Sequence, residues 1–281
     1  SAMIDSMDQG IGRVVETLKL NNQFENTLIF FMSDNGGCAE LMREDGDWSN
    51  TSQWETNLIN GEQVRVGNIP NLRPGPGTTF QSYETPWTNV SNSPFRLFKR
   101  WIHEGGISAP LIVHWPNEID EPRIESEPLH IMDIPATSID AAGAIYPNEF
   151  NGNKIKPIEG ESFLKLLSSK WAREKPMYWE HEGNQGIRIG EWKLVKEYGG
   201  EWELYNMIDD RTELNNLSAK DTDRVNDMSS KWEEWAKNSN VLQWPVDPNV
   251  MAKRLEGEHS HIHQHRGATA SQIAEGKGKF L

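Results

Sequence analysis

The sequence predicts an α/β fold that combines a layered core with a small antiparallel sheet carrying a packed helix. Three observations predict it. Apolar side chains recur at helical spacing over residues 3–20. Residues 27–32 and 111–115 are short, continuous apolar runs, as expected of strands buried on both faces. Four strand-like segments at 177–181, 186–189, 192–196 and 202–205 precede a polar helical segment at 221–238.

Composition excludes several classes of protein. The 281 residues are 36% hydrophobic and include 12 Trp, so a sizeable core is available. With 42 acidic and 28 basic residues the net charge is -14, which argues against nucleic acid as a partner. No run of about 18 apolar residues occurs, so no membrane span is expected. Because Cys38 is the only cysteine, intramolecular disulfides and Cys-rich zinc sites are excluded.

We expect three regions along the chain: an α/β core over residues 1–171, an antiparallel-sheet subdomain over 172–245 and a polar tail over 246–281. Helices are expected at 130–144 and 161–168, and a turn at Gly199-Gly200. The chain starts with Ser1-Ala2-Met3 and enters the first helical segment at once, without a lead-in strand or signal peptide. This start predicts a fragment.

Two segments have open interpretations. Residues 44–93 show little periodicity and predict a long surface insertion, which in a loop of this length is functional or disordered. Its aromatic residues favour ordinary packing, with a sugar-binding cleft as the alternative: Trp48, Trp54, Tyr83 and Trp87. The tail holds His259, His261, His263 and His265 at every second position, which would share one face of a metal-binding strand. A flexible, solvated tail is the favoured interpretation.

The first chemical motif is Ser33-Asp34-Asn35-Gly36, at the end of the first apolar run. In α/β sheets, ligand chemistry lies just outside the carboxyl ends of strands. A carboxylate and an amide oxygen side by side suit a hard cation such as calcium or magnesium. Asp-Asn-Gly is equally good turn chemistry, because Asn and Gly tolerate positive φ. The motif alone does not decide between a ligand and a turn.

The second motif lies in residues 94–110, which lead into the second apolar run. Lys99 stands five residues before Glu104, which opens a Glu-Gly-Gly turn. The glycine pair lets backbone approach closely, and Lys99 can serve as a point charge for an anionic oxygen. By itself this pattern equally describes a surface lysine before a tight turn.

Together, three segments in this order resemble the arylsulfatase family. They are the strand that ends in Asp-Asn-Gly-Gly, the Lys99 segment with Glu-Gly-Gly and the following Pro-Leu-Ile-Val-His-Trp-Pro, and the blocks within 179–217. The last is similar to the C-terminal subdomain of bacterial members. The resemblance implies a partial alkaline-phosphatase-like core and the hydrolysis of sulfate esters, on sulfated small molecules or carbohydrates.

The resemblance also implies roles for particular residues. Asp34 and Asn35 match ligands of a divalent cation, usually calcium. Lys99 matches the lysine that contacts the sulfate group and neutralises charge developing on its oxygens. His181 lies in a block near the active site of related enzymes and is a candidate substrate contact. For His103, packing beside Glu104 is favoured over a role in the site.

The nucleophile of the family is a formylglycine made from the first residue of a Cys/Ser-x-Pro/Ala-x-Arg pattern. Cys38 is followed by Ala-Glu-Leu-Met, so it lacks both the Pro/Ala and the Arg. The remaining ligands and active-site Lys and His residues belong upstream in the family. We therefore expect this chain to be inactive alone and to need the missing N-terminal part as a partner. The resemblance favours a periplasmic or secreted location without deciding it.

Two alternatives remain at this stage. One is a phosphodiesterase or phosphonate hydrolase of the same superfamily, although such enzymes usually hold two metals with His ligands. The other is a truncated relative that acts only as a binding or structural module. An in-frame nucleophile motif in the DNA upstream of Met3 would support a cut enzyme, and its absence the module.

Overall fold

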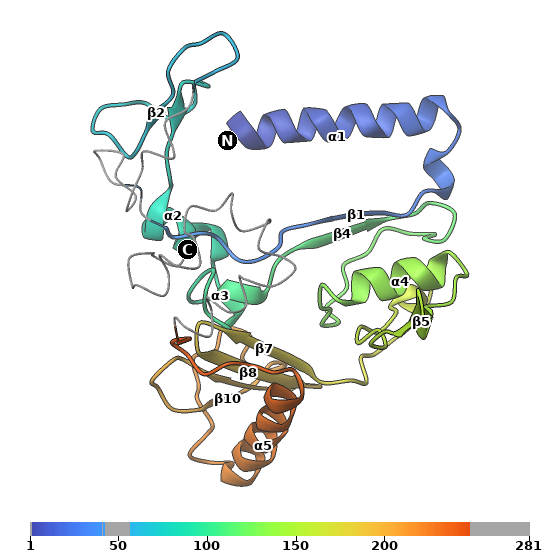
Figure 1. Ribbon diagram of the computed structural model, residues 1–281, viewed down its shortest axis with the longest axis vertical. Coiled ribbons are helices and arrows are strands. Elements are labelled where there is room, and N and C mark those ends of the chain that lie inside the picture. Colours follow the sequence, from blue (N-terminus) through green and yellow to red (C-terminus); the bar gives the residue numbers. More distant parts are fainter. Residues whose placement is uncertain (1, 41, 43–56, 248–281) are drawn as a thin grey trace.

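The computed structural model describes residues 2–40, 42 and 57–247. Trp48, Trp54 and the histidines at 259–265 lie outside these residues, so their expected roles stay predictions. Within the described part the chain forms a mixed α/β structure, with a small antiparallel sheet at one end (Figure 1).

The first segment forms α1 (Ala2–Leu20), a 3-10 turn (Phe24–Asn26) and β1 (Ile29–Met32). The second apolar run forms β4 (Leu111–His114), which pairs with β1 in antiparallel register from Ile29↔His114 to Met32↔Leu111. Both predicted strands and the helix are confirmed. None of the helices in the described ranges has the length and apolar character that crossing a bilayer requires.

Burial of both strands on two faces was a wrong prediction. Phe31 and Ile112 are register partners on one face, and they are 41% and 60% exposed. On the other face, Phe30 and Val113 pack against a cluster around Phe163. The continuous apolar runs hid this asymmetry, because every residue in them is apolar.

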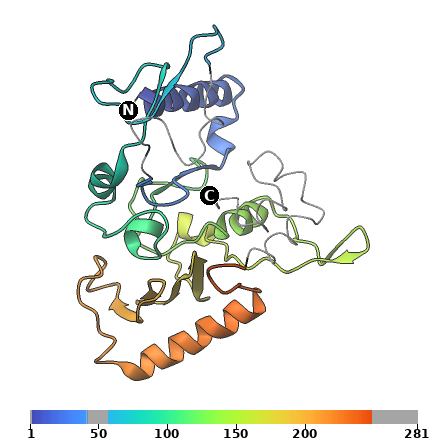
Figure 2. The same cartoon turned by 60° about the vertical axis from the view of Figure 1, so that its left-hand side comes forward.

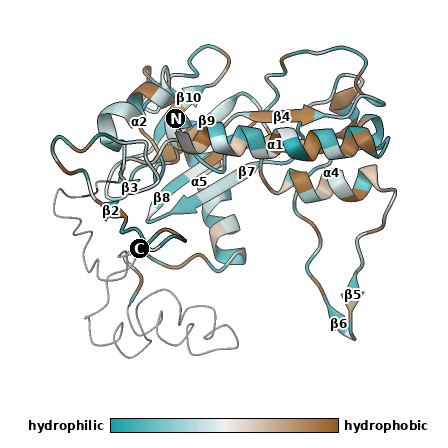
Figure 3. Cartoon of the chain, turned by 90° about the horizontal axis from the view of Figure 1, so that it is seen from above, coloured by the Kyte–Doolittle hydropathy of each residue, from teal (hydrophilic) through white to brown (hydrophobic). Residues whose placement is uncertain are grey.

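The apolar stripe of α1 is also exposed. Met3 is 77% and Val14 60% accessible, and Figure 1 shows α1 standing apart from the small sheet. Figure 3 shows hydrophobic residues along this helix. Helical spacing predicted the amphipathic helix correctly, but spacing does not determine what covers its stripe.

The described part of the insertion contains β2 (Arg65–Val66) and β3 (Thr79–Phe80), which pair in parallel, and α2 (Glu84–Asn92). Tyr83 is 42% and Trp87 65% exposed. The expectation of ordinary packing is therefore wrong for these two aromatic residues.

Short elements connect the core to the small sheet. They are α3 (Glu104–Ile107), α4 (Asp133–Ala141), a β5–β6 hairpin (Glu149–Phe150 and Asn153–Lys154) and a 3-10 turn (Leu164–Leu167). α4 is shorter than the expected 130–144. The Asp133 carboxylate accepts a hydrogen bond from the His130 N–H at the start, and Gly143 with φ +60° follows the end. The helix expected at 161–168 is reduced to the 3-10 turn.

The small sheet contains β7 (Met177–His181), β8 (Asn184–Ile189), β9 (Trp192–Lys196) and β10 (Glu203–Asn206), in the order β10-β9-β8-β7. All neighbours are antiparallel. One face packs Ile187, Leu194 and Leu204 against α5 (Thr222–Asn238). The other face packs Val195 and Tyr205 against Ile102. Figures 1 and 2 show α5 and α3 on opposite sides of this sheet, as predicted for a sheet with a packed helix.

Candidate active site

The Asp34-Asn35 motif forms a compact loop directly after β1. The Ser33 hydroxyl donates to the Asn35 carbonyl (2.9 Å), and Asn35 Nδ2 donates to the Gly36 carbonyl (2.9 Å). Asp34 is exposed, and Asn35 is half-buried. The loop thus uses the amide nitrogen of Asn35 internally, and the oxygen atoms of both side chains are the groups that it offers to a ligand.

Lys99 lies against this loop. Its backbone N–H donates to the Gly37 carbonyl (3.0 Å), and its ammonium Nζ lies 2.8 Å from Glu40 Oε1 and 4.0 Å from Cys38 Sγ. The antiparallel pairing explains this position, because the chain that enters β4 comes from the end where β1 leaves. The site therefore lies at the carboxyl end of β1 and at the amino end of β4, and not outside the carboxyl ends of both strands.

The charge around Lys99 keeps its ammonium protonated. The hydrogen bond with Glu40 raises the pKa of Lys99 above its ordinary value, against the effect of burial, and the charge of Asp34 acts in the same direction. The same hydrogen bond lowers the pKa of Glu40. Glu40 was not singled out from the sequence, because no motif distinguishes it from other surface glutamates.

Two side chains of α2 hold the loop and the Lys99 segment together. Asn92 Oδ1 accepts from the Gly37 N–H (2.9 Å), while its Nδ2 donates to the Leu97 carbonyl (2.9 Å). Thr88, fully buried, donates its hydroxyl to the Cys38 carbonyl (2.8 Å). Neither residue stands out in the sequence, since both lie in a stretch that shows no regular period.

Glycines permit the close approach that the Glu-Gly-Gly turn predicted. The Gly36 N–H donates to the Gly106 carbonyl (2.9 Å), and a Cβ on Gly36 would lie 1.7 Å from the Gly105 carbonyl oxygen. A Cβ on Gly105 would lie 2.2 Å from the Arg96 carbonyl oxygen. Three backbone segments therefore meet here with no room for a side chain.

Asp34 and Asn35 fit part of a calcium site. A carboxylate and an amide oxygen are ligands of the correct chemistry, but calcium takes six to eight oxygens. The two residues would hold one side of the ion, and other residues would have to supply the remaining ligands.

His181, the last residue of β7, is exposed beside a tight turn. Glu182 and Gly183 have φ of 51° and 79°, as hairpin turns of two residues require. The turn contacts the residue after Lys99: Asn184 Nδ2 donates to the Arg100 carbonyl (3.2 Å), and Arg100 pairs with Glu182 (2.6 Å). Within the described ranges no hydrogen bond joins the His181 side chain to Lys99 or Asp34.

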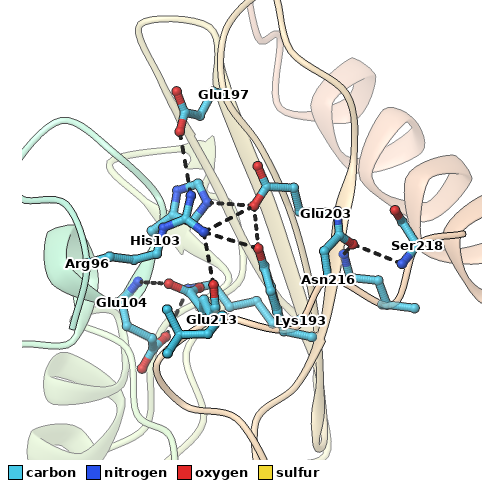
Figure 4. A network of polar contacts seen from close by, with 12 residues as sticks. Arg96, His103, Glu104, Lys193, Glu197, Glu203, Glu213, Asn216 and Ser218 are labelled. Carbon is cyan, nitrogen blue, oxygen red and sulfur yellow. Dashed lines mark hydrogen bonds and ion pairs between the residues drawn. The ribbon is translucent and has the colours of Figure 1, made fainter. Parts of the chain in front are cut away.

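His103 is buried, and its Nε2 lies 3.3 Å from Glu203 Oε2, in accord with the packing interpretation. With Glu197 and Glu203 it forms a group whose ligand atoms lie within 4.8 Å of one another, close enough for a metal ion. Arg96 already lies 4.0 Å from the Glu197 carboxylate and 3.7 Å from that of Glu203 (Figure 4). A guanidinium that neutralises both carboxylates competes with a cation, so we interpret the group as an ion-pair cluster.

An α/β chain in which an Asp-Asn loop at a strand end lies against a lysine segment agrees with the resemblance to the arylsulfatases. The family model "Sulfatase" matches residues 1–144, and the model "N-sulphoglucosamine sulphohydrolase, C-terminal" matches residues 95–238. Each match covers about half of the chain. The chain belongs to the sulfatase family.

Individual relatives agree. An uncharacterized sulfatase of Schizosaccharomyces pombe is 29% identical over 259 residues, which are 88% of this chain and 44% of that protein. The arylsulfatase of Klebsiella aerogenes is 30% identical over 173 residues, 61% of this chain and 34% of its own length. A crystal structure of Ps i-CgsB with k-i-k-neocarrahexaose shares the fold, with a TM-score of 0.59 and 24% identity over 94% of this chain and 48% of that one. The chain thus spans less than half the length of these relatives.

Proposed function

We propose that the complete protein hydrolyses sulfate esters, and that this chain contributes one side of the active site. Lys99 is assigned the sulfate contact, and Asp34 and Asn35 are assigned as ligands of a calcium ion. The observation that carries the proposal is the hydrogen bond from the Lys99 N–H to the Gly37 carbonyl, which holds Lys99 against the loop that contains Asp34 and Asn35.

Each residue has a defined task. The ammonium of Lys99 is held protonated by its acidic neighbours, and it neutralises the negative charge that develops on the sulfate oxygens. Glu40 accepts a hydrogen bond from this ammonium (2.8 Å), and because an ammonium has three N–H donors, others can be donated to a sulfate oxygen. A calcium ion, when bound, adds positive charge that draws electron density from the sulfate group. Asp34 and Asn35 would hold this ion from the β1 side.

A carbohydrate sulfate is the proposed substrate class, with an aryl sulfate as the minimal substrate. Two findings support a carbohydrate: one of the two matching family models is that of N-sulphoglucosamine sulphohydrolases, and a solved structure holds Ps i-CgsB in complex with k-i-k-neocarrahexaose. His181 is proposed as a substrate contact. Its support is the position of the β7–β8 turn against Arg100, the residue after Lys99.

The reaction needs a covalent nucleophile that these residues do not supply. No Cys or Ser in the chain begins a Cys/Ser-x-Pro/Ala-x-Arg pattern, and Lys99 can stabilise charge but not attack sulfur. We propose that the chain alone has no turnover. We propose that its partner in catalysis is the formylglycine-bearing part of a sulfatase. In support, the match covers only 44% of the Schizosaccharomyces pombe relative, so most of that protein lies outside it.

The test is hydrolysis of a chromogenic aryl sulfate and of a sulfated sugar. We expect the purified chain to show no turnover, and a longer polypeptide with a matured formylglycine to show turnover that falls strongly in Lys99→Ala. Activity of the chain alone that disappears in Cys38→Ala would contradict the proposal and make Cys38 catalytic. Full activity of the longer Lys99→Ala polypeptide would contradict the role of Lys99.

A further inference from the structure

A buried ion triad lies between the small sheet and the Lys99 segment. The Lys193 ammonium, fully buried on β9, lies 2.9 Å from Glu104 Oε1 and 2.7 Å from Glu213 Oε1. The side chain of Glu104 is 5% exposed and that of Glu213 is 0% exposed. Arg211 lies 3.7 Å from the other oxygen of Glu104, so the four charges cancel. Figure 4 shows Lys193, Glu104 and Glu213 converging.

The triad joins three separate segments. Lys193 belongs to the central part of the small sheet, Glu104 begins α3, and Glu213 follows β10. Glu213 also accepts, through Oε2, the backbone N–H of Glu104 (2.8 Å). Both the side chain and the backbone N–H of Glu104 therefore attach the start of α3 to the small sheet and the segment that follows it.

A second group of contacts joins the same two parts. Arg96 donates to the Glu213 carbonyl (2.9 Å) and to the Tyr205 hydroxyl (3.3 Å), and His103 bonds to Glu203. With the triad, these contacts attach both ends of residues 96–104 to one face of the sheet. Lys99 lies between them.

The conformation of this segment needs outside support. Leu97 and Arg100 have φ of 66° and 107°, a region that residues with a Cβ rarely adopt. Such conformations cost about 1–3 kcal/mol each and persist where the surroundings over-determine them. The same segment must place the Lys99 N–H on Gly37 and the Gly106 carbonyl on Gly36.

We propose that Lys193 is a positioning residue for Lys99. Through Glu104 and Glu213 it anchors residues 96–107 to the small sheet, and this anchor holds Lys99 against the Asp34-Asn35 loop. The C-terminal sheet thereby determines the geometry of a site to which Lys193 contributes no atom. The inference takes the role of Lys99 from the proposed function, but the positioning itself is measured without sulfate.

The electrostatics explain why Lys193 in particular anchors the segment. Burial raises the pKa of Glu104, but the charge and hydrogen bond of the Lys193 ammonium, together with the charges of Arg188 and Arg211, bring the pKa below its ordinary value. Without Lys193, two carboxylates would face each other in a dry site, and the start of α3 would move toward solvent. Leucine or methionine at position 193 would carry no charge and would not hold Glu104.

The experiment measures amide hydrogen exchange in the full chain, because the Lys99 N–H itself donates to the loop. In Lys193→Met we expect exchange of the amides in 97–107 to accelerate about tenfold or more beyond the change in global stability. Glu104→Gln, which leaves one carboxylate for the ammonium, should give a smaller acceleration of the same amides. If Lys193→Met does not fold, the exchange rates of Glu104→Gln test the positioning role on their own.

The matched control is Ile187→Val, on the face of the sheet that packs against α5. This variant should lower the melting temperature, and the amides of residues 97–107 should exchange faster only by the amount that the loss of global stability predicts. Acylation of the Lys99 amine, relative to Lys237 on α5, should increase in Lys193→Met and Glu104→Gln but not in the control. Exchange and acylation that follow global stability in every variant would overturn the positioning role.

Sulfate binding is measured separately, by titration of the unmodified chain and Lys99→Ala with a sulfated sugar. If the two bind equally while exchange changes as expected, the proposed contact of Lys99 is wrong and its positioning by Lys193 still holds. If sulfate binding depends on Lys99 but exchange does not respond to Lys193, the proposed sulfate contact of Lys99 holds and its positioning by Lys193 is wrong.

Discussion

Glu203 shows how one ionisable residue couples residues 96–104, which contain Lys99, to the small sheet. Its hydrogen bond with His103 is the main reason why its pKa falls from 4.5 to about 2, against the effect of burial; the Tyr205 hydroxyl adds to the lowering. A carboxyl whose pKa is lower in the folded state stabilises the fold when it is ionised. This stabilisation is complete above about pH 4.5 and is lost as the pH falls toward 2.

We therefore expect Glu203→Gln to lower the melting temperature at pH 7, with a difference from the unmodified chain that shrinks between pH 4.5 and 2. Melting curves across this range measure it. Glu201→Gln, at an exposed position on the neighbouring turn, is the control and should follow the unmodified chain. If the difference in melting temperature between Glu203→Gln and the unmodified chain stayed constant with pH, ionised Glu203 would not be the stabilising group.

At the scale of elements, the loop after β1 and the start of α3 depend on backbone contact without side chains. A Cβ on Gly36 would overlap the backbone of Gly105, which cannot rotate away as a flexible side chain can. The contact lies between two elements that are far apart in the sequence. Local propensity therefore has no influence on it.

Gly36→Ala should lower the melting temperature and expose the Lys99 amide to exchange, because the loop must move away from α3. Gly12→Ala is the matched control. A Cβ there meets no atom within 4 Å, and alanine in a helix is favoured over glycine by up to about 1 kcal/mol. Equal melting temperatures for the two variants would show that the loop accommodates the methyl group.

The two faces of the β1–β4 pair should respond differently to a polar residue. Ile112→Thr lies on the exposed face, so we expect less self-association and an unchanged melting temperature. Val113→Thr lies on the face packed against the Phe163 cluster and should lower the melting temperature. Sedimentation velocity and thermal melts distinguish them. A loss of stability in Ile112→Thr would mean that this face is covered in solution.

At the scale of the whole molecule, the candidate metal site combines few ligands with a negatively charged chain. Asp34 and Asn35 provide two of the six to eight oxygens that calcium takes. The net charge of -14 attracts cations in general, but long-range attraction does not replace missing ligands.

Thermal melts of this chain with and without 1 mM calcium should therefore nearly coincide. A dissociation constant above about 1 mM corresponds to less than about 0.4 kcal/mol of stabilisation at that concentration. Asp34→Asn is the control, and its melts should coincide in the same way. A large stabilisation that Asp34→Asn abolishes would mean that further residues of this chain complete a calcium site.

The sequence by itself determined the elements with a clear local period. These are α1, the two apolar strands, the four strands of the small sheet and α5, since hydrophobic spacing and turn residues are properties of neighbouring positions. It also indicated Asp34, Asn35 and Lys99, because each lies in a recognisable motif. Their roles in catalysis remain predictions.

Only the tertiary structure decided which strand faces are covered and how the site is held. Contacts between distant segments decide three features: the exposure of Ile112, the hydrogen bonds of Asn92 to the loop and to the Lys99 segment, and the Lys193 triad. Lys193 and Glu104, for example, are 89 positions apart. An amphipathic period shows that a face is apolar but not what packs on it. A charged residue within an apolar strand, such as Lys193, is recognised as an anchor only when its buried partners are in place.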